Sequence, residues 1–115
     1  MGRGLQSPVH RLRIEENGKQ VNVRYYFDEA TGRPHIHAHG VREEEVEDIL
    51  RYPDEDRPGR EGSRVAVGQT RAGRYLRVVY VPEPDEDGMF VITAYELTGK
   101  PLAALRRRRR RTQHP

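Results

Sequence analysis

The sequence predicts an α+β fold, in which an antiparallel β-sheet is packed by one main helix and followed by a short C-terminal helix. Apolar and polar residues alternate in five strand-like segments, which are 9–14, 20–27, 63–69, 74–81 and 89–97. The first two are joined by a stretch containing Asn17-Gly18, a pair typical of tight hairpin turns. The last three follow one another with short connections, which favours a meander. We therefore expect an N-terminal hairpin plus a three-stranded meander.

The main helix is expected between Gly40 and Tyr52-Pro53. Val46, Ile49 and Leu50 fall at i, i+3 and i+4 and make one apolar face. Three glutamates in the first turn suit the positive end of the helix dipole. The helix must cover one face of the sheet, because a half-apolar sheet needs a partner layer.

Two further segments are the stretch between the main helix and the third strand, and the fourth strand. The polar segment 54–62 contains Pro and Gly and is predicted to be a loop. In segment 74–81, one face carries Leu76, Val78 and Tyr80, and the other carries Tyr75, Arg77, Val79 and Val81. The pattern alone does not decide which of these faces meets the helix.

Composition limits the classes of protein. The chain has 115 residues, of which 34% are hydrophobic, so one small domain over residues 1–105 with a tail at 106–115 is expected. The absence of Cys excludes disulfides and thiolate metal sites. No apolar run approaches the ~20 residues of a membrane helix, and the N-terminus lacks the apolar core of a secretory signal, so a cytoplasmic protein is expected. Phosphate-loop and Gly-x-Ser-x-Gly motifs are absent, and no cofactor is predicted.

Charge is concentrated at the C-terminus. The formal net charge is +3, but without a run of six arginines it becomes −3. The run consists of Arg106, Arg107, Arg108, Arg109, Arg110 and Arg111. A dense arginine block favours a polyanion such as nucleic acid, and a solvated tail is the alternative. Segment 99–111 is predicted to form the final helix, fraying after Leu105, because a short helix of like charges is marginal without tertiary support.

Three histidines lie at alternate positions, His35, His37 and His39. On a strand they would share one side, as a three-histidine metal site requires. In a helical turn, His37 would point away from the other two. Pro34 is typical of the first position of a helical turn, and Gly40 is typical of its C-terminal cap. These boundary residues favour the helical alternative, and no metal is predicted. Two interpretations remain open: either His39 alone is functional, or all three histidines have structural or surface roles.

Several motifs resemble the BrnT family of toxins. These are "FDEATGRPHIHAHGV" (27–41), "SRVAVGQTRAGRYLRVVYV" (63–81) and "FVITAYEL" (90–97), which together place the resemblance over residues 25–110. The same motifs resemble a related group of small bacterial domains of unknown function. The BrnT resemblance implies a RelE-like fold, a small ribonuclease activity and a cognate antitoxin protein that neutralises it. Tyr95 and Ala38 stand where that family usually has Arg and Lys.

The resemblance assigns candidate catalytic residues. His39 matches the His before Gly-Val, and Arg64 and Arg74 match the two arginines of the central motif. Metal-free RNA cleavage needs a base, an acid and positive charge on the phosphorane, which His39, Tyr95 and the arginines would supply, with Arg77 as a further phosphate contact. Structural alternatives exist: His39 capping a turn, Arg64 and Arg74 at strand ends, Arg77 paired with Glu96, or Tyr95 in the core.

Two functional hypotheses follow from these residues. The first is a metal-independent endoribonuclease of a toxin–antitoxin pair that acts through His39, Arg64, Arg74 and Tyr95. The second is a non-catalytic module on the same scaffold that binds nucleic acid or protein through Arg77 and the arginines at 106–111. In both, RNA is the expected nucleic acid and no membrane partner is expected.

Overall fold

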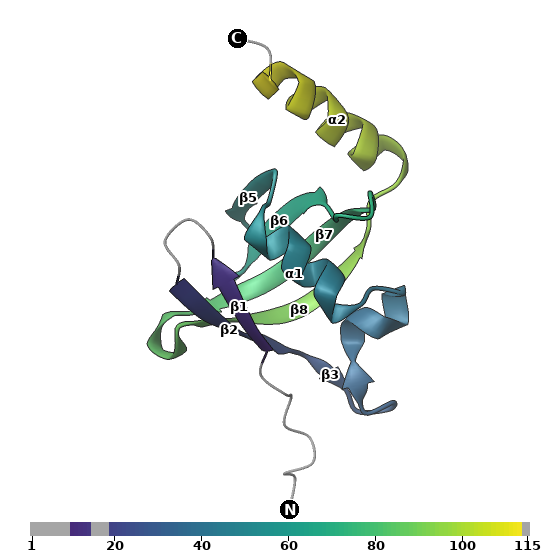
Figure 1. The fold of residues 1–115 in the computed structure, drawn as a ribbon. Helices are drawn as coiled ribbons and strands as arrows, with labels where there is room; N and C mark the ends of the chain where they lie inside the picture. The colour runs from purple at the N-terminus through teal and green to yellow at the C-terminus, as the bar shows by residue number, and fades with distance from the viewer. Residues whose placement is uncertain (1–9, 15–18, 114–115) are drawn as a thin grey trace, which may run out of the picture.

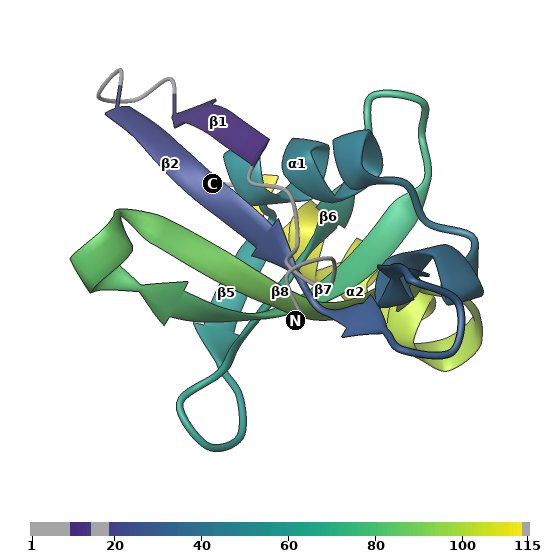
Figure 2. The same cartoon turned by 90° about the horizontal axis from the view of Figure 1, so that it is seen from below.

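The computed structural model describes residues 10–14 and 19–113, which form a twisted six-stranded sheet and, in these ranges, two α-helices (Figures 1 and 2). The sheet strands are β1 (His10–Ile14), β2 (Lys19–Tyr25), β5 (Glu55–Pro58), β6 (Arg64–Gln69), β7 (Tyr75–Glu83) and β8 (Gly88–Glu96). The other elements are β3 (Phe27–Asp28), β4 (Arg33–Pro34), the 3-10 helices η2 (His35–His39) and η3 (Pro84–Glu86), and the α-helices α1 (Glu43–Arg51) and α2 (Gly99–Gln113). The predicted α+β class is confirmed.

The sheet is mixed, so the prediction of a purely antiparallel sheet is wrong. The strand order is β1-β2-β8-β7-β6-β5, and β2 runs parallel to β8 with Tyr25 opposite Val91. The β1–β2 pair and the β6, β7 and β8 neighbours are antiparallel. A parallel pair needs a long connection, and here the chain between β2 and β8 includes α1 and the strands β5 to β7. The expected turn at Asn17-Gly18 lies outside the described residues.

The predicted loop at 54–62 contains an edge strand, so this expectation is wrong for β5. Glu55 pairs with Val67 and Arg57 with Val65, both antiparallel. Charged residues and a terminal Pro are typical of edge strands, where one side of the backbone has no strand partner. A polar composition is therefore typical of an edge strand as well as of a loop, and composition alone does not separate the two.

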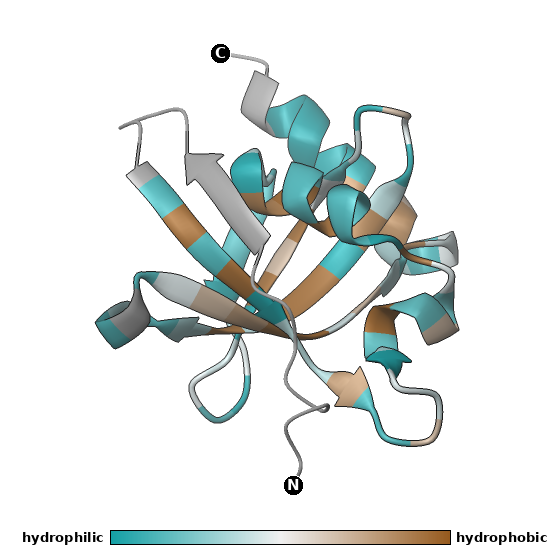
Figure 3. Cartoon of the chain, turned by 60° about the horizontal axis from the view of Figure 1, so that its bottom comes forward, coloured by the Kyte–Doolittle hydropathy of each residue, from teal (hydrophilic) through white to brown (hydrophobic). Residues whose placement is uncertain are grey.

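The main core lies between the sheet and α1. Val46, Ile49 and Leu50 are buried there, as their spacing predicts. The strand β7 turns Leu76 and Val78 toward α1, and both have no exposed surface, which settles the face left open by the sequence. Figure 3 shows the underlying alternation as brown and teal bands along the strands.

The opposite face of the sheet carries a smaller apolar cluster, to which α2 docks. Leu105 is fully buried against Val67 and Leu97, with Val65, Tyr75 and Leu102 packed around them. Figure 1 shows α2 at the side of the sheet formed by β5 and β6. The helix continues to Gln113, so the expected fraying after Leu105 is wrong. Leu105 supplies the tertiary support that the isolated arginine segment lacks.

In residues 10–14 and 19–113, neither α-helix combines the length and the apolar character that crossing a lipid bilayer would require.

Candidate functional site

The three neighbouring histidines lie in a helical turn. His35 to His39 form η2, and Gly40 ends it with a φ of 71°, a left-handed conformation that glycine adopts at little cost. The strand alternative is therefore wrong. His35 Nδ1 lies 2.9 Å from Asp28 Oδ1, whereas His37 Nε2 lies 2.8 Å from Glu43 Oε1. Since His37 has a different partner from His35, the three imidazoles do not converge on one point, and the described residues contain no group of three potential metal ligands.

Four rings form a continuous series along one corner of the molecule. The centroids of Tyr26 and His35 are 6.0 Å apart, those of His35 and His39 5.0 Å, and those of His39 and Tyr95 6.0 Å, each pair meeting edge to face. We call these four residues the ring row. Tyr26, His39 and Tyr95 are exposed, with 47% of Tyr26 and 36% of Tyr95 accessible. The ring row therefore offers aromatic surface to a ligand.

Strand pairing explains why these rings meet. The parallel partner of β8 ends where Tyr25 faces Val91, so the rest of that β8 edge has no strand beside it. The Tyr26 N–H donates to the Val91 carbonyl, and η2 packs against β8 beyond this point. As a result, His39 lies beside Tyr95, although 55 positions of sequence separate them.

Arg74 is held in place at the same corner. Its Nη1 donates to Glu45 Oε1 and to the Gly40 carbonyl, both at 2.9 Å, and its Nε lies 3.4 Å from Glu96 Oε1. We call this group the Arg74 clamp, because it ties the η2–α1 junction to β8. Glu96 thus pairs with Arg74, and Arg77 instead lies opposite Tyr95. The Arg74 guanidinium therefore has a structural role, in which it binds Gly40, Glu45 and Glu96.

The carboxylate of the clamp is buried and ionised. Burial of Glu45, only 8% exposed, opposes its ionisation, but hydrogen bonds from the Arg42 backbone and the Arg74 guanidinium prevail and lower its pKa. The same hydrogen bond from Arg74 to Glu45 raises the pKa of Arg74. Both groups therefore keep their charges at neutral pH, which is what a buried ion pair needs to be stable.

Arg64 does not belong to this corner. On β6 it lies opposite Tyr80, whereas Gln69 lies opposite Tyr75, next to Arg74. Five residues of strand correspond to roughly 16 Å. Arg64 Nε donates to Asp56 Oδ1 at 2.9 Å, and the same carboxylate accepts the Tyr80 hydroxyl at 2.6 Å. Burial and then Asp56 raise the pKa of Tyr80 to about 12, so this group is a neutral structural phenol.

The arginine run is divided by the helix into two sides. Arg108 binds Glu55 through two hydrogen bonds, and Arg109 donates to the Tyr75 hydroxyl at 2.8 Å and lies 3.3 Å from Asp54. Both share the docking side with Leu105, at i, i+3 and i+4. Arg107, Arg110 and Arg111 have the same spacing on the opposite side and are exposed. We call these three the outer arginine face.

Arg106 is exposed as well, but its guanidinium lies 5.2 Å from the centre of the Tyr75 ring, a cation–π distance. Arg106 therefore borders both sides of α2 and is not counted with the outer arginine face.

Of the four predicted catalytic residues, the structure brings His39, Arg74 and Tyr95 to one corner and leaves Arg64 elsewhere. Tyr26 and His35 join this corner without having been predicted. His35 stands in the same motif as His39, which is a usable signal. Tyr26 offers none, because its place depends on the parallel pairing of β2 with β8.

Comparison with known proteins gives one result. A family model described as a domain of unknown function, DUF4258, matches residues 33–96, which is more than half of the chain. The match includes η2, the Arg74 clamp and Tyr95. No curated protein matches the sequence, and no solved structure matches the fold.

Proposed function

Since the chain belongs to the DUF4258 family, whose function is unknown, we propose from its own geometry that it is a small RNA-binding module. In this proposal the outer arginine face contacts phosphates, and the ring row stacks on unpaired bases. The observation that carries it is the division of α2 into a docking side and an outer arginine face.

The outer arginine face supports the proposal because its side chains are exposed and are not those that dock α2 onto the described part of the sheet. The described contacts of Arg108 and Arg109 with Glu55, Asp54 and Tyr75 account for the docking of α2. Docking does not require Arg107, Arg110 and Arg111, which are exposed on the other side. Guanidinium groups at helical spacing match the phosphates of a nucleic-acid backbone, and the positive charge of the chain is concentrated in α2, since without the six arginines of the run the net charge is −3.

The ring row supports single-stranded RNA as the ligand. Unpaired bases stack on exposed tyrosine and histidine rings, and such stacking tolerates many sequences. Tyr95 and His39 present two of these rings at 6.0 Å from each other. A duplex would keep its bases inside and gain little from these rings.

A second candidate is the endoribonuclease of a toxin–antitoxin pair, with a RelE-like fold, a cytoplasmic location and a cognate antitoxin. The observation that favours it is the exposed imidazole of His39 beside Tyr95. His39 would take the proton of the 2′-hydroxyl, and Tyr95 would donate one to the leaving 5′-oxygen. The engagement of Arg74 in the clamp leaves the phosphorane without that guanidinium, so binding without cleavage is the function that the geometry supports better.

The test is RNA binding measured by fluorescence anisotropy over a series of salt concentrations. The double variant Arg107→Gln/Arg111→Gln should weaken binding and reduce the salt slope by about 1.4, since each phosphate contact on a single strand contributes about 0.7. The matched control is Arg60→Gln/Arg71→Gln, which removes the same charge from exposed positions outside α2. Equal losses in the two variants would contradict a specific role for α2.

The same samples separate binding from cleavage. Tyr95→Ala should weaken RNA binding by about 1–3 kcal/mol if a base stacks there. RNA recovered after incubation should be intact in the wild-type sample if the protein only binds. Shortened RNA that disappears with His39→Ala would instead favour the ribonuclease.

A further inference from the structure

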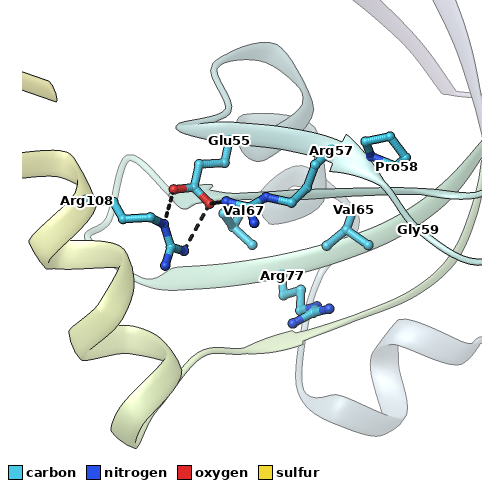
Figure 4. Close-up of a pocket in the computed structure, with 8 residues that line it drawn as sticks. All are labelled: Glu55, Arg57, Pro58, Gly59, Val65, Val67, Arg77 and Arg108. Carbon is cyan, nitrogen blue, oxygen red and sulfur yellow. Dashed lines mark hydrogen bonds and ion pairs between the residues drawn. The ribbon is translucent and has the colours of Figure 1, made fainter.

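A small cavity lies on the face of the sheet to which α2 docks. It has a volume of about 190 Å³, and its walls include Arg57 of β5, Arg77 of β7, Arg108 of α2 and Glu55 (Figure 4). Val65 and Val67 of β6 line it as well. We call it the arginine pocket. We infer that the arginine pocket binds a phosphate group, and that in the RNA-binding function proposed above it receives the terminal phosphate of the RNA.

The charges of the pocket favour an anion. Three guanidinium groups and one carboxylate line it, which leaves a formal charge of +2. The carboxylate of Glu55 is already occupied, because Arg108 binds both of its oxygens and Arg57 Nη2 donates to it at 2.6 Å. The hydrogen bond from Arg108 is the main cause that lowers the pKa of Glu55, and Arg57 lowers it further. Glu55 therefore stays negatively charged and holds the two arginines in position. Within residues 10–14 and 19–113, no carboxylate is paired with Arg77 in this way.

Arg77 supplies a donor without an acceptor. Its Nε is buried and has no hydrogen-bond partner, as is also true of Thr93 Oγ1 among the described side chains. Buried donors are nearly always paired, so one that lines a cavity indicates a missing acceptor. Thr93 lies on the same face, opposite Val79 and therefore diagonal to Arg77. A phosphate oxygen beside Arg77 would provide the acceptor, because guanidinium N–H groups suit phosphate in a bidentate geometry.

The pocket adjoins the ring row through the sheet. Cross-strand pairing places Glu55, Val67, Arg77 and Tyr95 in one line across β5, β6, β7 and β8. Directly opposed residues on one face have Cβ atoms about 5 Å apart. Arg77 is therefore the immediate neighbour of Tyr95. A nucleotide stacked on Tyr95 has the arginine pocket beside it.

The size of the pocket indicates a terminal phosphate. Pockets for whole ligands measure roughly 300–1,000 Å³, so about 190 Å³ suits one phosphate group with its ester oxygen and not a complete nucleotide. The sheet forms the floor on which Val65 and Val67 stand, and an RNA strand cannot continue through a sheet. A chain end, which needs room for the strand on one side of the phosphate alone, therefore suits this shape better than an internal phosphate.

The experiment compares three RNA oligonucleotides of one sequence, with a 5′-phosphate, a 3′-phosphate or neither, by fluorescence anisotropy. One of the two phosphorylated forms should bind about tenfold tighter than the unphosphorylated RNA, which is the effect of one or more charged hydrogen bonds. Arg77→Gln should abolish the difference. Arg60→Gln, which removes the same charge at an exposed position outside the pocket, should preserve it.

Inorganic phosphate provides a second measurement, which separates this inference from the proposed function. Titration of the full-length protein with phosphate, followed by the ¹H–¹⁵N resonance of Arg77 Nε, should shift that resonance and leave that of Arg60 in place. If phosphate shifts Arg77 but no RNA binds, RNA as the source of the phosphate is overturned together with the proposed function. If all three RNAs bind equally and phosphate shifts nothing, the pocket is overturned while RNA binding stands.

A further variant covers the case in which Arg77→Gln does not fold. Arg57→Gln changes a side chain that is 59% exposed at the same pocket, so folding should be retained. It should reduce the advantage of the phosphorylated RNA. An unchanged advantage in folded Arg57→Gln and Arg77→Gln proteins would contradict the assignment.

Discussion

The two faces of the sheet are built from the same strands but use their residues differently. The face toward α1 buries Leu76, Val78 and Ala94 completely. At its border, the buried carboxylate of Glu45 is paired with the Arg74 guanidinium. The face toward α2 carries two buried polar atoms, Arg77 Nε and Thr93 Oγ1, that have no hydrogen-bond partner among the described residues, and a small apolar cluster lies beside them. Stability is therefore concentrated on the first face, whereas the second face keeps polar groups available for a ligand.

The largest effect expected from this comparison is on the α1 face. Ile49→Ala removes a fully buried side chain of the main core and should lower the free energy of unfolding by about 2–5 kcal/mol. Urea unfolding followed by circular dichroism measures it. A loss below about 1 kcal/mol would mean that the α1 face is not the principal core.

The matching change on the α2 face should have a smaller global effect. Leu105→Ala also truncates a fully buried side chain, but its cluster is small and α2 can detach while the sheet remains folded. We expect less than half of the loss caused by Ile49→Ala, with amide exchange accelerated in α2 and unchanged in β7. Equal global losses would show that the two faces unfold as one unit and would contradict a separate stability for each face.

The Arg74 clamp should give the next effect. Arg74→Ala removes the guanidinium donor of the buried Glu45 carboxylate, which then keeps the Arg42 backbone N–H, and of the Gly40 carbonyl, and this should cost about 1–3 kcal/mol. The control is Arg71→Ala, since Arg71 is 79% exposed and its pair with Asp48 should contribute at most about 1 kcal/mol. Adding Glu45→Gln to Arg74→Ala should recover part of the loss, because it removes the unpaired charge. If the double variant recovers nothing, the loss of stability in Arg74→Ala does not come from the ion pair with Glu45.

Local patterns predicted the elements whose partners are close in sequence. The spacing of Val46, Ile49 and Leu50 predicted α1 and its buried face, and Pro34 with Gly40 predicted the helical turn of η2. In each case the deciding contacts lie within a few residues. Alternation likewise predicted two unlike faces on β7, but not which of them meets α1, because that choice depends on where a distant helix lies.

What depends on distant partners was not predictable. The parallel pairing of β2 with β8 has no local signal, and it alone brings Tyr26 to the ring row. The strand β5 has the composition of a loop because only one side of it is paired. Arg64 and Arg74 look alike in sequence, yet one faces Asp56 and the other Glu45. The extension of α2 depends on the carboxylates of Asp54 and Glu55, which a local pattern cannot assign to the arginines.

The smallest effect concerns acid and the docking of α2. The pKa of Glu55 is lowered in the folded protein, chiefly by Arg108, from an ordinary value of 4.5. Its stabilising contribution is therefore fully present above pH 4.5 and is lost as the pH falls through the lower folded pKa. Because the pair is partly exposed, the contribution should be about 1 kcal/mol or less.

Acidification below pH 4.5 should therefore loosen α2 before the α1 face, and Leu105 methyl resonances should move while those of Ile49 stay. In Glu55→Gln the Leu105 resonances should already be shifted at neutral pH and should lose this acid transition. If they follow the same transition in both proteins, Glu55 does not control the docking of α2. The arginine pocket would then need another group to hold Arg108 in position.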